Sequence, residues 1–152
     1  MLKGSSRRII SVFLPTWPTD RLRRTADTGA PPADQPVVTA MRDGQRRVVA
    51  ACDVVAASAH LAPGTSIAHA RALVPGLSVL ESDPDADCQG LMNLGVAFLK
   101  RFSPLVALDQ DDGLLLDATG CAHLFGGEPG MVLTIAEYVS DLGIAARVAR
   151  SA

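Results

Sequence analysis

A helix between residues 84 and 101 is the best-marked element of the sequence. Asp83 and Pro84 are typical of a helix start, because a carboxylate caps free amide groups and proline needs no hydrogen-bond partner there. Lys100 and Arg101 close the last turn, where their charge complements the helix dipole. Apolar residues recur at helical spacing and predict a face that packs on a sheet. These residues are Cys88, Leu91, Met92, Leu94, Phe98 and Leu99.

Short apolar runs around this helix predict the strands of that sheet. The expected strands are residues 9–14, 77–81, 105–108, 114–118 and 144–149, and a second helix is expected over residues 130–142. When residues 17–76 are set aside, the order of these elements is typical of an α+β fold, with a ferredoxin-like sheet and its helices on one face.

Residues 17–76 predict a small insert of a different kind. Asp43-Gly44 favours a tight hairpin turn between strands at residues 37–41 and 46–51. Two short helices should follow, and a proline-rich loop should precede the hairpin. We therefore expect one subdomain made of residues 7–16 and 77–152, interrupted by an insert made of residues 17–76.

Charge and cysteine content narrow the class of protein. Residues 1–50 carry nine Lys and Arg against four Asp and Glu, whereas the rest of the chain is acidic. No run approaches the roughly 18 apolar residues of a membrane span. The cysteines Cys52, Cys88 and Cys121 are odd in number and far apart, which argues against a disulfide framework and favours the reducing cytoplasm.

Three segments resemble Y-family (translesion) DNA polymerases. Residues 63–75, PGTSIAHARALVP, resemble a fingers segment of that family, and Leu116-Asp117-Ala118-Thr119 is similar to its Leu-Asp-x-Thr palm strand. Residues 120–128, GCAHLFGGE, resemble the ImuB group of polymerase-like mutagenesis proteins. The resemblance covers residues 7–150 and implies an amino-terminal palm and fingers fragment, without the family's thumb, little finger and carboxyl-terminal tail.

The resemblance also implies where metal carboxylates should lie. Palm chemistry uses two Mg²⁺ ions to stabilise the attacking and leaving oxygens together. Alignment with the family pattern puts Phe13 at the first carboxylate position, retains Asp112 and puts Gly113 at the third position. Asp109 and Asp111 leave open a shifted carboxylate set, or an acidic turn in water. We expect no metal site, and Mg²⁺ held through Asp112 only if the shifted set is used.

Nucleotide and DNA contacts can be compared with the family in the same way. Val54 and Ala57 replace a tyrosine and an arginine that hold the incoming triphosphate in the family, so those contacts are lost. The arginines of the insert fit either contact with DNA phosphates or a basic surface in water. These candidates are Arg21, Arg23, Arg24, Arg42, Arg46 and Arg47.

Taken together, these features favour a catalytically inactive polymerase-like protein of DNA-damage-induced mutagenesis and translesion synthesis. The resemblance implies an adaptor that binds DNA weakly and without sequence preference. In the full-length protein it also implies contacts with an error-prone polymerase, an accessory recombinase-like protein and the sliding clamp. Two alternatives remain: an active metal-dependent Y-family polymerase that uses the shifted set, and an unrelated small α+β interaction module.

Overall fold

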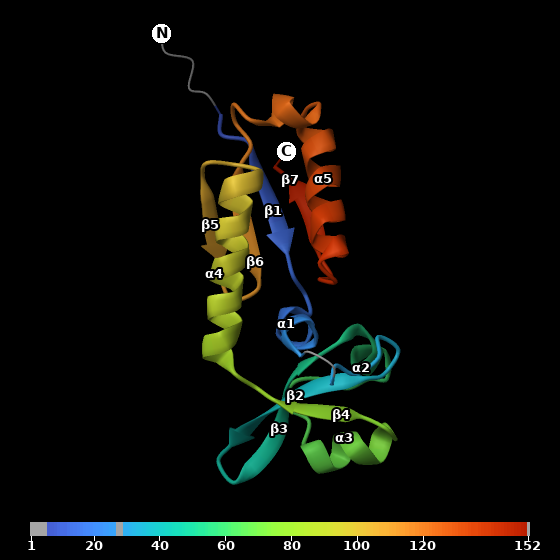
Figure 1. Ribbon diagram of the computed structural model, residues 1–152. Helices are drawn as coiled ribbons and strands as arrows, with labels where there is room; N and C mark the ends of the chain where they lie inside the picture. The colour runs from blue at the N-terminus through green and yellow to red at the C-terminus, as the bar shows by residue number, and fades with distance from the viewer. Residues whose placement is uncertain (1–5, 27–28, 152) are drawn as a thin grey trace. The chain divides into compact units, whose positions relative to one another are not determined.

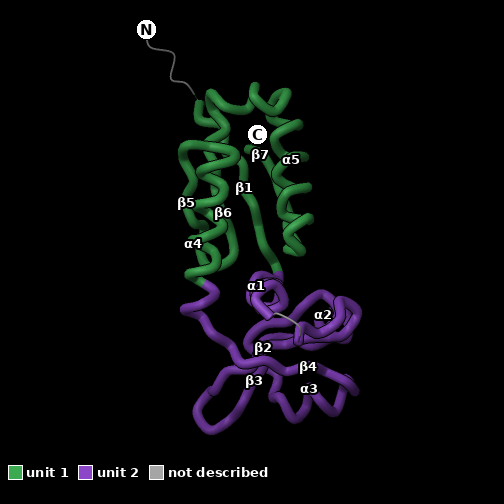
Figure 2. Tube along the Cα trace, viewed as in Figure 1, with its two compact units in different colours: residues 1–15, 88–152 green, residues 16–87 purple. Residues whose placement is uncertain are grey.

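The computed structural model describes residues 6–26 and 29–151 (Figure 1). The chain forms two compact units, which we call unit 1 (residues 1–15 and 88–152) and unit 2 (residues 16–87) (Figure 2). None of the described helices is both long and apolar enough to cross a membrane.

Unit 1 is built on a four-stranded antiparallel sheet with the order β5-β6-β1-β7. Two helices, α4 and α5, accompany it (Figure 1). The bounds are β1 (Ile9–Phe13), α4 (Pro84–Arg101), β5 (Val106–Asp109), β6 (Gly113–Asp117), α5 (Glu128–Asp141) and β7 (Arg147–Arg150). This order and pairing confirm the predicted ferredoxin-like palm sheet.

One face of this sheet forms the core of unit 1. Ile10 and Val12 of β1 lie opposite Leu116 and Leu114 of β6, and all four side chains are buried. Helices α4 and α5 meet through Phe98 and Tyr138, whose ring centroids are 5.9 Å apart, so both helices cover the same face. The apolar face of α4 is narrower than predicted, because its buried residues are only Leu91, Leu94, Gly95 and Phe98. The other predicted members Cys88, Met92 and Leu99 are exposed.

Unit 2 has a three-stranded sheet with the order β3-β2-β4. The β2–β3 pair is the predicted hairpin, and Gly44 in its turn has φ +64°. The bounds are α1 (Trp17–Thr25), β2 (Val37–Asp43), β3 (Arg46–Cys52), α2 (Val54–Ser58), α3 (Ile67–Leu73) and β4 (Ser78–Glu81). Residues 21–24 lie in α1, a helix that was not predicted and that begins at Trp17 with Pro18 in its first turn.

The boundary at the carboxyl-terminal end of unit 2 also differs from the prediction. Sequence analysis assigned residues 77–81 to the palm-like subdomain, but β4 pairs with β2 in parallel. The division of the chain therefore falls after residue 87 and not after residue 76. The local sequence predicted a strand correctly, whereas its pairing partner depends on contacts far along the chain.

The backbone conformation of residues 120–128 explains why this run is rich in glycine, which the sequence alone did not show. Gly120, Gly126 and Gly127 have φ values of +82°, +77° and +104°, a region that side chains rarely adopt. They flank a short 3₁₀ helix, η1 (Ala122–Phe125), and lead directly into α5. This run therefore connects the last residues of β6 to α5 through a backbone path that requires glycine.

Ion pairs join the start of α5 to the residue before β1 and to β7. Arg8 donates to both carboxylate oxygens of Glu128, at 2.7 and 2.9 Å, and Arg150 of β7 lies 3.4 Å from the same carboxylate. Glu128 is the first residue of α5, where negative charge also suits the helix dipole. The hydrogen bond from Arg8, followed by charge attraction from Arg8 and Arg150, holds the pKa of Glu128 below its ordinary value.

We expect unit 1 to lose stability as the pH falls through and below the range in which a glutamate side chain ordinarily titrates, because the pKa of Glu128 is lowered in the folded state. A carboxyl group with a lowered pKa in the folded state stabilises the fold above its unfolded pKa, and this contribution disappears as the pH falls through the folded pKa. Glu128→Gln should be less stable than the wild type at neutral pH and should show a smaller loss on acidification. Thermal melting at several pH values measures both effects. Glu137→Gln, an exposed change on the same helix, is the control, and a pH dependence identical in wild type and Glu128→Gln would contradict the expectation.

Candidate functional site

The strand register brings four residues into one row at the end of the unit 1 sheet. Phe13 of β1 lies opposite Gly113 of β6 on one side and opposite Arg147 of β7 on the other. Asp109 of β5 lies opposite Gly113, so the row reads Asp109, Gly113, Phe13, Arg147. Phe13 is 39% exposed, on the sheet face that the helices do not cover. The register therefore places the aligned positions Phe13 and Gly113 opposite each other on neighbouring strands.

This row does not fit a pair of Mg²⁺ ions. Magnesium requires oxygen ligands, and the row offers one carboxylate, one apolar side chain, one glycine and one cation. The guanidinium of Arg147 beside Phe13 would also repel a cation. Among residues 6–26 and 29–151, no group of three or more His, Cys, Asp or Glu side chains could hold a metal ion.

The acidic hairpin turn lies next to this row. Asp112 precedes Gly113, and its carbonyl oxygen accepts a hydrogen bond from the Leu14 amide at 2.7 Å. Asp111 is exposed, and Gln110 has a φ of +57° in the same turn. A side chain on residue 113 would have little room, because a Cβ there would lie 3.1 Å from the Asp109 carbonyl oxygen and 3.2 Å from that of Val12. The backbone here thus favours glycine where the family pattern has a glutamate.

The Leu-Asp-x-Thr motif at residues 116–119 makes hydrogen bonds that link two strands of the unit 1 sheet. The Asp117 carboxylate accepts a hydrogen bond from the Thr119 amide at 2.8 Å. Hydrogen bonding from the Thr119 side chain is the main cause that lowers the pKa of Asp117, and the Thr119 amide is the second. The hydroxyl oxygen of Thr119 in turn accepts the Arg8 amide at 2.8 Å. The motif thereby fastens the start of β1 to the end of β6.

Val54 and Ala57 occupy one exposed side of α2, one turn apart. The Val54 side chain is 64% exposed, and both side chains are hydrocarbon. The structure therefore places the two positions together, as the family pattern requires, but they offer no hydrogen bond or charge to a triphosphate.

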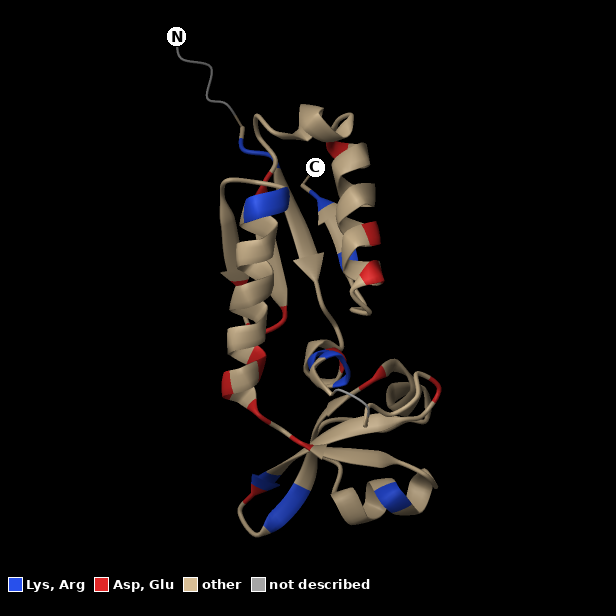
Figure 3. Ribbon diagram, viewed as in Figure 1, with Lys and Arg blue, Asp and Glu red and all other residues tan. Residues whose placement is uncertain are grey.

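The arginines of unit 2 have different environments, and two of them are engaged inside the unit. Figure 3 shows basic residues on α1, on the β2–β3 hairpin and on α3. The Arg21 side chain is buried and its Nε donates to the Asp87 carboxylate at 2.5 Å. Arg23 pairs with Asp53 at 2.9 Å. Each of these guanidinium groups therefore has a carboxylate partner within unit 2, and contact of Arg21 and Arg23 with DNA stays a prediction.

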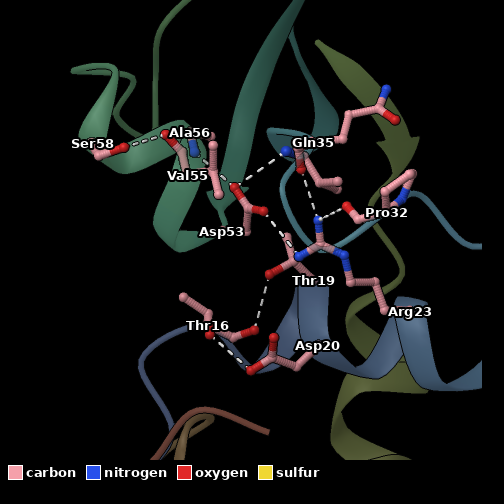
Figure 4. Close-up of polar contacts among 11 residues, drawn as sticks. Thr16, Thr19, Asp20, Arg23, Pro32, Gln35, Asp53, Val55, Ala56 and Ser58 are labelled. Carbon is pink, nitrogen blue, oxygen red and sulfur yellow. Dashed lines mark hydrogen bonds and ion pairs between the residues drawn. The ribbon is translucent and has the colours of Figure 1, made fainter. Parts of the chain in front are cut away.

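The Arg23–Asp53 pair lies at the centre of a polar network (Figure 4). Asp53 also caps α2 by accepting the Ala56 amide at 2.8 Å, and the same oxygen accepts the Val37 amide at 3.2 Å. The guanidinium of Arg23 further donates to the carbonyl oxygen of Gln35 at 2.8 Å. This network ties α1, α2 and the start of β2 together.

Three of the predicted arginines are exposed on the β2–β3 hairpin. Arg42, Arg46 and Arg47 lie at its tip end, and Arg42 is directly opposite Arg47 in the register. A fourth arginine, Arg71 of α3, was not among the predicted residues and lines a pocket with Arg46 and Arg47. Arg71 lies inside the 63–75 segment that carries the family resemblance, but only the packing of α3 on β3 shows that it joins the hairpin arginines.

Comparisons with known proteins identify the fold. The chain is 15% identical to a Dbh DNA polymerase in a post-insertion binary complex and 16% identical to DinB from Sulfolobus solfataricus, with TM-scores of 0.70 and 0.65. Each match covers 95% of this chain and 42% of the solved chain. A Y-family DNA polymerase chimera matches with a TM-score of 0.65. The chain has the palm and fingers fold of Y-family DNA polymerases.

A curated relative shows which polymerase-like protein the sequence of this chain is similar to. The chain is 46% identical to Protein ImuB of Caulobacter vibrioides over 89 residues, in both the NA1000 and the CB 15 strain. The match covers 59% of this chain and 19% of ImuB, so the chain spans only a small part of that relative's length. No protein-family model matches the chain. The similarity to ImuB confirms the predicted resemblance to the ImuB group.

Proposed function

We propose that this chain is a catalytically inactive, polymerase-like part of a protein that acts in translesion synthesis and mutagenesis. The observation that carries the proposal is the position of Phe13 between Gly113 and Arg147, in the row where a palm needs carboxylates. The fold and the similarity to ImuB support the wider class and argue against an unrelated interaction module.

The row of Asp109, Gly113, Phe13 and Arg147, which we call the palm row, explains why this chain would not transfer nucleotides. Phosphoryl transfer depends on positive charge placed between the attacking and leaving oxygens, which carboxylates supply by holding metal ions. In this chain Phe13 supplies no ligand and Arg147 adds a fixed positive charge beside it. The hydrocarbon side chains of Val54 and Ala57 would also leave a triphosphate without contacts on α2. These two losses are independent of each other.

DNA binding by the β2–β3 hairpin is the second part of the proposal. Arg42 and Arg47 face each other across the hairpin, and like charges directly opposite each other destabilise a strand pair. Such an arrangement suits a surface whose charge is neutralised by a phosphate backbone. Contacts of this kind do not depend on base sequence. The activity proposed for the protein is thus adaptor binding, without synthesis.

The partners proposed for the full-length protein follow from the family resemblance. They are an error-prone polymerase, an accessory recombinase-like protein and the sliding clamp, and the palm and fingers described above would serve as the DNA-contacting part. No cofactor is assigned to the palm row, because its side chains do not fit the metal ions of an active polymerase.

Primer extension is the direct test of the inactive palm. We expect no extension product above a buffer control when the chain is incubated with primed template, the four deoxynucleotides and either Mg²⁺ or Mn²⁺. An active Y-family polymerase under the same conditions is the positive control. Metal-dependent extension that disappears in Asp112→Ala would refute the proposal and establish the alternative, an active site with a shifted carboxylate set.

A further inference from the structure

Three arginines line one shallow pocket of unit 2. The pocket has a volume of about 400 Å³, which is within the range of small-ligand sites. Its lining residues are Arg46, Arg47, Ser66, Ile67, Ala68 and Arg71. Since the first two arginines belong to β3 and the third to α3, the fold brings these charges together from separate segments.

The walls of this pocket are held in place by backbone contacts. The amide of Val49 donates to the Thr65 carbonyl oxygen at 2.7 Å, and the Gly64 amide donates to the Val49 carbonyl oxygen at 2.8 Å. Ile67 is 5% exposed and belongs to the buried cluster that joins α3 to the sheet. The spacing of the arginines is therefore set by the core of unit 2, and a ligand would not have to order the backbone first.

Glu81 already places a carboxylate at this cluster. It forms an ion pair with Arg47, and the side chains of Glu81 and Arg47 are 75% and 41% exposed. Exposed ion pairs contribute little to stability, so this contact is easily exchanged. A phosphate offers more charge and more acceptor oxygens than one carboxylate, and guanidinium groups suit it well.

We propose that Arg46, Arg47 and Arg71 form a binding site for a backbone phosphate of DNA, and that Glu81 competes internally for Arg47. This inference rests on the proposed function, because it specifies which residues of the fingers unit hold the DNA. Glu81 occupies Arg47 when no phosphate is bound and is released when a phosphate arrives. The pocket is thereby partly neutralised in the free protein.

The competition changes how binding responds to salt. Each phosphate neutralised on single-stranded DNA releases counterions and gives a slope of about −0.7 in log K against log salt concentration. In the wild type, the released Glu81 takes up a cation from solution, which offsets part of this release. Removal of the Glu81 charge should therefore make the slope steeper and the binding tighter.

Fluorescence anisotropy with a labelled single-stranded oligonucleotide tests the proposal on the full chain. We expect Glu81→Gln to tighten binding about two- to fivefold at low salt and to steepen the slope. Arg71→Ala should weaken binding and flatten the slope by about 0.7. Glu137→Gln and Lys100→Ala, exposed changes of the same sign in unit 1, control for net charge and should leave the slope unchanged. Fluorescence of Trp17, the one tryptophan, checks that unit 2 remains folded.

Three other results would each contradict a different part of the proposal. Oligonucleotide binding that is the same in wild type, Glu81→Gln and Arg71→Ala would overturn the pocket, while DNA binding elsewhere on the chain would stand. Absence of binding even in Glu81→Gln would overturn the pocket together with DNA binding by the hairpin, and would leave the inactive palm unaffected. Inorganic pyrophosphate that competes as tightly as the oligonucleotide would assign the pocket to free phosphates and overturn its assignment to DNA.

Discussion

Asp53→Ala should destabilise unit 2 by about 3–5 kcal/mol, the usual cost of leaving one member of a buried ion pair without its partner. The Asp53 side chain is 3% exposed, and Arg23 is 20% exposed. The substitution removes the ion pair, the cap of α2 and the acceptor for the Val37 amide in one step. Denaturant unfolding followed by the fluorescence of Trp17 measures the loss, because this tryptophan is buried in the same unit.

Two further variants separate the contributions of Asp53. Asp53→Asn retains an oxygen for the two amide groups and loses the charge and the acceptor oxygen that face Arg23, so its loss of stability should be smaller than that of Asp53→Ala. Asp34→Ala, an exposed change in the same unit, should stay within about 0.5 kcal/mol of the wild type. An Asp53→Ala protein as stable as the Asp34→Ala protein would show that the network does not hold unit 2 together.

Gly130→Ala should destabilise unit 1 by about 2–3 kcal/mol, although alanine is normally favourable in a helix. A Cβ on residue 130 would overlap the backbone carbonyl oxygen of Phe125 and lie 3.1 Å from its carbonyl carbon. Because these are backbone atoms at the end of η1, the clash cannot be relieved by a change of rotamer. Amide hydrogen exchange in α5 and β7 measures the loss within unit 1.

Gly95→Ala is the matched control for this clash. Residue 95 is also a helical glycine, but a Cβ there would meet only Leu114 Cδ2 at 3.6 Å and Leu108 Cδ2 at 3.8 Å, which are ordinary contacts. This variant should be as stable as the wild type or more stable by up to about 1 kcal/mol. Equal stabilities for Gly130→Ala and Gly95→Ala would mean that α5 does not approach η1 as closely as described.

Much of the secondary structure was predictable because its signals are local. Asp83 caps α4 by accepting the Ala86 amide at 3.1 Å, and Ser66 caps α3 by accepting the His69 amide at 3.2 Å, both as their positions before a helix suggest. The turn at Gly44 was equally clear. By contrast, α1 was missed, since its polar residues have no apolar periodicity and its start depends on Trp17 becoming buried.

The candidate sites were less predictable than the elements, because each depends on a partner far along the chain. The arginines of the insert look alike in the sequence, but Arg21 and Arg23 form ion pairs with Asp87 and Asp53, while Arg46 and Arg47 are exposed. Nothing within the local sequence distinguishes these cases. The burial of an arginine is decided by whether a carboxylate reaches it through the fold, since an unpaired buried charge is costly.

The sequence by itself determined which segments form most of the strands and helices, in the order β, insert, β, α, β, β, α, β, and which residues, Phe13 and Gly113, align with carboxylate positions of the family that it resembles. These facts depend on residue types and on spacing along one chain. Only the tertiary structure decided that β4 joins β2, that Arg147 lies beside Phe13, and that Arg71 lines a pocket with the hairpin arginines. The physical reason is that strand register and helix packing are set by hydrogen bonds and buried contacts between distant segments, and no local pattern encodes which segments will meet.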